Sequence, residues 1–145
     1  MERHEPKDQE SGFTLVELMV VIFILGLLTT IVVINVLPSQ DKAMSGKAKA
    51  DIATLEQAME MYRLDMFKYP DAAEGLGALK AAPASLSDDK RYRQGGYIRR
   101  LPKDPWGNDY QYAAPGRTEA FDIYSLGADG QLGGTDNAAD IYGGE

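Results

Sequence analysis

Three carboxylates lie close together near the C-terminus, in a stretch without lysine or arginine. Asp129, Asp136 and Asp140 fall within twelve residues, among several glycines. Oxygen ligands on a flexible loop suit Ca²⁺, which takes six to eight of them at about 2.3–2.6 Å. The spacing is not that of an EF-hand, because Gln131 and Gly133 stand at its third and fifth positions. From composition alone, a calcium loop and a disordered acidic tail are equally open.

A fourth carboxylate, Glu17, lies at the beginning of a long apolar segment, one helical turn after Phe13. An ionised carboxylate within hydrocarbon costs about 2.5 kcal/mol or more, so it needs a partner or must reach the interface. If the chain is cut after Gly12, the new α-ammonium of Phe13 is the matching charge. If this ammonium group belongs to a neighbouring chain, its pairing with Glu17 would set the axial register of a polymer.

The composition excludes several other chemistries. The chain has no cysteine and its single histidine is His4, which removes disulfides, thiolate sites and a histidine-based triad from consideration. A net charge of −7 without clustered bases argues against nucleic acid. The sequence has no glycine-rich loop ending in GK[ST], so no nucleotide site is expected. A membrane-anchored enzyme is disfavoured, because no carboxylate pair is matched to a nucleophile.

One long helix is expected to position Glu17. Residues 18–37 are almost wholly apolar and, at 1.5 Å each, span roughly the 30 Å of bilayer hydrocarbon. A cleaved secretory signal is the competing interpretation, but its apolar core is shorter and its leader basic. Beyond Pro38 the helix becomes amphipathic and is expected to end near residue 67, before Tyr69-Pro70. Its predicted buried stripe consists of Ile52, Leu55, Met59, Tyr62 and Met66.

The rest of the chain predicts a small β-rich region. A short helix is expected at residues 75–81 and the beginning of a strand at 95–98. Residues 109–113 and 121–126 alternate in polarity and would pair as a hairpin. The large side chain of Trp106 is expected to pack against the amphipathic part of the long helix.

The string GFTLVE at residues 12–17, followed by the apolar run, resembles the N-terminal signal of type IV pilins and type II secretion pseudopilins. In that family a prepilin peptidase cleaves after the glycine and methylates the new N-terminal phenylalanine. The resemblance implies cleavage between Gly12 and Phe13, N-methylation of Phe13, and Glu17 as the assembly glutamate.

Strings in the second half resemble the major, G-type pseudopilins of type II secretion: GGYIRRLP at 95–102, DPWGN at 104–108 and YSLGADG at 124–130. The resemblance implies a structural calcium in the C-terminal loop, with either Asp136 or Asp140 as its second carboxylate. The implied ligand set is the carbonyls of Leu126 and Gln131, the carboxylate of Asp129, and groups of Thr135, Asp136 and Asp140. Two arginines, Arg99 and Arg100, would contact acidic faces of neighbouring subunits or lie solvated on the surface.

The fold implied by the resemblance is α+β and pilin-like. A long N-terminal helix, its first half transmembrane, would pack on a small antiparallel sheet with a C-terminal metal-binding loop. Residues 1–12 would be a cleaved leader, 13–37 the transmembrane and assembly helix, and 38–145 a periplasmic domain.

The implied function is that of a structural subunit, not an enzyme. It would polymerise into a periplasmic pseudopilus that drives type II protein secretion across the outer membrane of a Gram-negative bacterium. Its partners would be copies of itself, minor pseudopilins, the prepilin peptidase and the inner-membrane secretion platform. It would cross the inner membrane once, with its C-terminal domain in the periplasm. The alternative is a type IV or competence pilin, which usually closes its C-terminal region with a disulfide that this chain cannot form.

Overall fold

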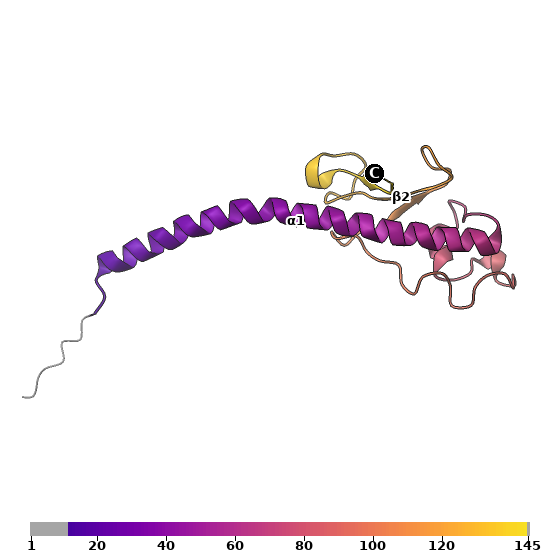
Figure 1. Ribbon diagram of the computed structural model, residues 1–145, viewed down its shortest axis with the longest axis horizontal. Helices are drawn as coiled ribbons and strands as arrows, with labels where there is room; N and C mark the ends of the chain where they lie inside the picture. Colours follow the sequence, from indigo (N-terminus) through magenta and orange to yellow (C-terminus); the bar gives the residue numbers. More distant parts are fainter. Residues whose placement is uncertain (1–11, 145) are drawn as a thin grey trace, which may run out of the picture. The chain divides into compact units, whose positions relative to one another are not determined.

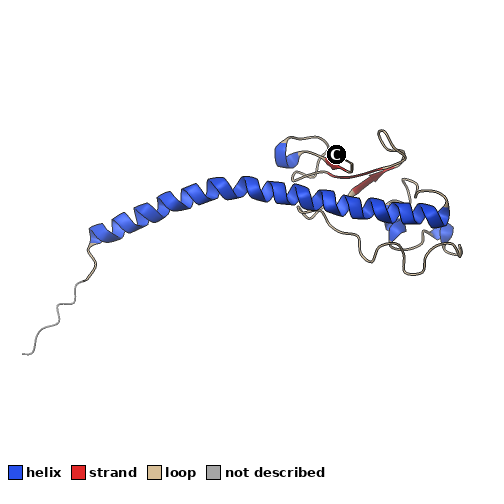
Figure 2. Cartoon of the chain, viewed as in Figure 1, coloured by secondary structure: helices blue, strands red, loops and turns tan. Residues whose placement is uncertain are grey.

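The long helix α1 runs over Leu15–Met66 in the computed structural model, which describes residues 12–144. The chain divides into two compact units, Met1–Ser39 and Gln40–Glu145, and α1 contributes to both (Figure 1). Short strands, 3₁₀ turns and connecting loops make up the rest of the second unit (Figure 2). The predicted single long helix is therefore confirmed, with its ends within two residues of those expected.

The first unit is the apolar part of α1. Among the described residues, α1 is the helix that is long and apolar enough to span a membrane, with a mean hydropathy of 2.9 in its most apolar window. The hydroxyl groups of Thr29 and Thr30 donate to the carbonyls of Leu25 and Gly26, at 2.7 and 2.9 Å. These bonds satisfy polar groups that would otherwise be costly in hydrocarbon.

The second unit has its core along one stripe of α1. All five predicted stripe residues are buried: Ile52, Leu55, Met59 and Tyr62 are fully inaccessible and Met66 is 4 % exposed. Side chains from beyond the helix complete this core, chiefly Leu79, Tyr97, Tyr110 and Ile123, with Trp106 partly buried against it. The 3.6-residue period of the sequence thus identifies the face of α1 that is covered.

A three-stranded antiparallel sheet belongs to this unit, in the order β1 (Gln111–Ala113), β2 (Asp122–Ser125), β3 (Ile141–Tyr142). Tyr112 pairs with Ile123, and Tyr124 with Tyr142. The hairpin of β1 and β2 confirms the sequence prediction. The two-residue strand β3 was not predicted, because a pair of residues carries no readable alternation. It returns the chain to β2 after the acidic loop.

The prediction of a strand at residues 95–98 is wrong. Gly95 and Gly96 adopt φ values of 85° and 78°, and the amides of Tyr97 and Ile98 both donate to the Leu79 carbonyl, at 2.7 and 3.2 Å. Two successive residues with positive φ form a turn, not a pleated strand. The helical turn expected at 75–81 is present as the 3₁₀ turn η1 (Leu76–Leu79).

Candidate functional site

The acidic loop connects β2 to β3 and contains the 3₁₀ turn η3 (Asp136–Ala138). Its shape depends on glycines with positive φ. A Cβ added at Gly127 would lie 2.7 Å from the Ala139 carbonyl oxygen, and one at Gly134 would overlap the Ala138 carbonyl. The two ends of the loop therefore approach each other closely, and only glycine leaves room for this approach.

Hydrogen bonds within the loop use part of its acidic side chains. The Gln131 amide donates to Asp129 Oδ1 at 3.0 Å, and the Gly133 amide donates to Asp140 Oδ2 at 2.9 Å. The Ala128 amide donates to the Asn137 carbonyl at 2.9 Å. These contacts hold two of the three carboxylates in defined positions on the loop backbone.

The second carboxylate oxygen of Asp140 is exceptional. Oδ1 is buried and, within the described residues, has no hydrogen-bond partner. A buried carboxylate oxygen without a donor is costly, because it has lost water and gained nothing in exchange. A cation beside it would remove that cost. By contrast, Asp129 and Asp136 are exposed, and Asp136 adopts a φ of 55°.

The structure brings only some of the predicted calcium ligands close together. The described residues contain no group of three or more Asp, Glu, His or Cys side chains close enough to hold a metal. A site here would therefore depend on backbone carbonyls, as the expected contributions of Leu126 and Gln131 already imply. Gln131 and Thr135 are exposed, and Leu126 is half-buried. The ligand set stays a prediction.

A buried polar network lies directly before the loop. Asp104, 4 % exposed, accepts the amides of Trp106 and Asn108 on Oδ1, at 3.1 and 2.8 Å. Its Oδ2 accepts the Ser125 hydroxyl at 2.7 Å, and Ser125 Oγ in turn accepts the Gly127 amide at 3.1 Å. Sequence reasoning missed this network. The aspartate in DPWGN signals an Asx turn, but its contact with Ser125 joins residues 21 apart.

The N-terminal motif forms a reciprocal cap on α1. The Thr14 amide donates to Glu17 Oε2 at 3.1 Å, and the Glu17 amide donates to Thr14 Oγ1 at 3.2 Å. This is a capping box, in which a threonine and a glutamate three residues later satisfy two free amides of a helix N-terminus. Gly12 and Phe13 lie in irregular backbone before it, with Phe13 93 % exposed. Residues 1–11, most of the predicted leader, lie outside the described residues.

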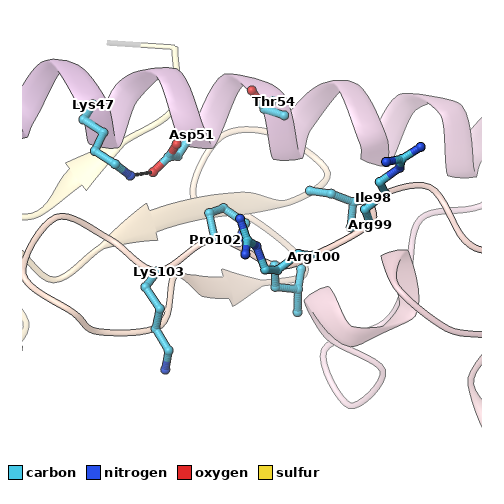
Figure 3. Close-up of a pocket in the computed structure, with 9 residues that line it drawn as sticks. Lys47, Asp51, Thr54, Ile98, Arg99, Arg100, Pro102 and Lys103 are labelled. Atoms are coloured by element: carbon cyan, nitrogen blue, oxygen red, sulfur yellow. Dashed lines mark hydrogen bonds and ion pairs between the residues drawn. The ribbon is translucent and has the colours of Figure 1, made fainter.

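A groove with basic residues lies between α1 and the segment 98–103. Figure 3 shows Lys47 and Asp51 of α1 joined by an ion pair, with Arg99, Arg100 and Lys103 on the facing segment. Lys103 pairs with Asp109 at 2.8 Å. Within the described part of the chain, neither arginine forms an ion pair, and both are exposed.

Two family models match the sequence. The model described as "Type II secretion system (T2SS), protein G" matches residues 35–144, and the model for the prokaryotic N-terminal methylation motif matches residues 7–33. The chain belongs to the type II secretion protein G family. The first match alone covers more than half of the chain, and the two together reach from the leader to the last described residue.

Relatives in the protein G family support this over nearly the whole length. The type II secretion system core protein G of Pseudomonas aeruginosa is 51 % identical over 133 residues, which is 92 % of this chain and 94 % of that protein. The Vibrio cholerae core protein G is 52 % identical over 133 residues, covering 92 % and 90 %. The crystal structure of the major pseudopilin of enterohaemorrhagic Escherichia coli matches with a TM-score of 0.65 at 44 % identity, covering 74 % of this chain and 92 % of that one.

Membership of the protein G family confirms the main expectations from sequence. The chain is a major pseudopilin of type II secretion with a pilin-like fold, and it is a structural subunit rather than an enzyme. The N-terminal methylation motif confirms the class of signal at residues 12–17. The type IV or competence pilin alternative is set aside by the same matches.

Proposed function

We propose that the chain is cut between Gly12 and Phe13 by a prepilin peptidase, methylated on Phe13, and then polymerised with copies of itself into a periplasmic pseudopilus. That fibre would drive type II secretion across the outer membrane. One observation carries the proposal: the apolar segment of α1 is exposed along its length, with side chains such as Ile22 and Phe23 61 % and 73 % accessible. An apolar helix surface of this extent needs lipid or other helices around it.

Before assembly, residues 13–37 would cross the inner membrane once, with residues 38–145 in the periplasm. During assembly the same segment would exchange lipid for the apolar helices of neighbouring subunits. Minor pseudopilins, the peptidase and the inner-membrane platform would be its further partners. Arg99 and Arg100 suit contact with acidic faces of neighbouring subunits, since both line the groove, are exposed, and form no ion pair among the described residues.

Glu17 would specify the register of the fibre. Cleavage after Gly12 creates an ammonium group on Phe13, and the carboxylate of Glu17 on the adjacent subunit is its natural partner. The capping box supports this role, because it holds the carboxylate at the N-terminus of α1, the end where the new ammonium arises. Such a buried charge pair specifies position more than it adds stability.

A calcium ion would complete the acidic loop. Two observations support it: Asp140 Oδ1 is buried without a hydrogen-bond partner among the described residues, and Asp129, in the same loop, offers a second carboxylate. Leu126 and Gln131 would supply carbonyls, with groups of Thr135 and Asp136 as further ligands. Bound calcium neutralises clustered negative charge and ties down a loop that no disulfide can hold. The Asp140 oxygen favours this residue over Asp136 as the second carboxylate.

Fibre formation tests the proposal. In cells carrying the cognate secretion system, fibres sheared from the surface or sedimented from lysates are quantified for the unaltered chain and Glu17→Gln. We expect fibres of Glu17→Gln to fall ~tenfold or more, because the unpaired ammonium would be buried, while the membrane-bound subunit persists. Thr29→Val is the matched control, because it removes from the same segment a hydroxyl that donates to the Leu25 carbonyl of its own helix. Unaltered fibre yield in Glu17→Gln would contradict the proposal.

A further inference from the structure

The turn at residues 104–108 is joined to the acidic loop by a chain of buried hydrogen bonds. Asp104 is 4 % exposed and Ser125 is fully buried. A carboxylate can only accept and a backbone amide can only donate. The hydroxyl of Ser125 must therefore donate to Asp104 Oδ2 and accept from the Gly127 amide, at 2.7 and 3.1 Å. Its orientation is fixed from both sides.

The Gly127 amide belongs to the same peptide group as the Leu126 carbonyl. This group is planar, and in the trans form its N–H and C=O point in opposite directions. A hydrogen bond that fixes the Gly127 N–H therefore also fixes the direction of the Leu126 carbonyl oxygen. That oxygen is one of the ligands expected for the cation.

The same turn touches the loop a second time. A Cβ added at Gly130 would lie 3.5 Å from Nδ2 of Asn108, so the amide side chain of Asn108 packs beside Gly130. The position of Asn108 is itself fixed, because its backbone amide donates to Asp104 Oδ1 at 2.8 Å. Gly127 and Gly130 bracket Asp129, which means that the loop is supported on both sides of its first expected carboxylate ligand.

We infer that Asp104 and Ser125 are positioning residues for the cation loop, fixing the Leu126–Gly127 peptide group before any cation binds. The inference rests on the proposed calcium site. Neither side chain is among the expected ligands. Both act through the backbone, in the way that outer groups orient the ligands of a metal centre. The geometry also explains why a carboxylate is buried here: three donors compensate it, and two of them come from its own turn.

Calcium titration tests the inference with a matched pair of variants. Ser125→Ala removes the hydroxyl between Asp104 and Gly127. Tyr112→Phe removes a hydroxyl from the neighbouring strand that bonds to the Pro70 carbonyl, far from the loop in sequence. The full chains in detergent are titrated with calcium chloride by calorimetry, at a temperature where circular dichroism shows each to be folded. We expect Ser125→Ala to raise the Kd about 10–100-fold and Tyr112→Phe to leave it unchanged.

Hydrogen exchange gives a readout that does not depend on calcium. In the cation-free chain, Ser125→Ala should speed exchange of the amides at residues 127–130 while Tyr112→Phe does not. Asp104→Asn is the second variant, to be measured if Ser125→Ala fails to fold. It should also weaken calcium binding. If the folded Ser125→Ala chain, or Asp104→Asn in its place, binds calcium with the Kd of the unaltered chain, the inference is overturned. A flat titration of the unaltered chain overturns the calcium proposal itself, so the two failures are distinguishable.

Discussion

Glu56 lies on α1 in a polar hollow that the residues 117–123 also line. Burial, followed by the negative charge of Glu119, raises the pKa of the Glu56 carboxyl. One turn further along the helix, Glu60 behaves oppositely. A hydrogen bond from Tyr69, followed by contacts with Arg63, holds the pKa of Glu60 below its usual value. The pKa values of two neighbouring glutamates on one helix are thus shifted in opposite directions, so their ionisation changes the stability of the fold with opposite signs.

Replacement of these glutamates by glutamine checks the signs. With a raised folded-state pKa, Glu56 binds its proton more tightly in the folded chain, so its ionisation lowers the free energy of unfolding as pH rises above the unperturbed value. Glu56→Gln should raise the melting temperature at pH ~7 and lose that gain near pH ~4. Glu60→Gln should lower the melting temperature at neutral pH. Equal shifts for the two variants at both pH values would contradict the assignment.

The sequence predicts the role of a residue best where that role depends on neighbours in the chain. The assembly role of Glu17 was predicted because its distance from Phe13 and its place before an apolar run can both be read from the sequence. That role stays a prediction. Thr14, three residues before Glu17, also has the spacing of a capping box. The cap was not predicted from that spacing, and the structure shows it. Asp104 and Ser125 could not be paired in advance, because nothing in a strand residue indicates which turn will pack beside it.

At the scale of elements, the buried stripe of α1 holds the second unit together. Leu55 is fully buried, whereas Leu64, on the same helix, is 69 % exposed. Leu55→Ala should lower the free energy of unfolding by about 2–5 kcal/mol, because it leaves a cavity in the core. Leu64→Ala should change it by less than about 0.5 kcal/mol. Urea unfolding followed by the fluorescence of Trp106, the single tryptophan, measures both. Similar losses for the two leucines would refute the assigned face.

The turn at Gly95 and Gly96 allows the cost of backbone strain to be measured apart from the cost of a steric clash when glycine is replaced. Both have positive φ, but a Cβ at Gly95 meets open space, while one at Gly96 would lie 2.5 Å from the Lys80 carbonyl oxygen. Gly95→Ala should cost about 1 kcal/mol from backbone strain alone. Gly96→Ala should cost clearly more, since the chain must also move. Urea unfolding midpoints compare them, and a larger loss for Gly95→Ala would show that the turn is packed differently.

Elements with a strong period were predictable and the others were not. The stripe of α1 and the hairpin of β1 and β2 repeat often enough to be recognised. The segment at 95–98 was mistaken for a strand because its aromatic and β-branched residues outweighed two glycines whose positive φ excludes pleating. Strand β3 is defined by pairing with β2, a long-range contact that leaves no trace in two residues.

At the scale of the whole molecule, stability has few sources. The chain has a net charge of −7 and no cysteine, and its core is confined to the second unit. A small domain with one modest core gains much from any additional constraint. A cation in the acidic loop would supply such a constraint and relieve repulsion among carboxylates. We propose that calcium completes the folded subunit in this way.

Thermal unfolding of the full chain in detergent, with calcium and then with a chelator, tests this claim most directly. Calcium at a hundredfold over its Kd should add about 2.7 kcal/mol if it binds only the folded form. For a folded unit of this size, that is a rise in melting temperature on the order of 10–20 °C. The rise should be lost in Asp129→Ala and not be reproduced by magnesium. Coincident melting curves with calcium and with chelator would contradict the claim.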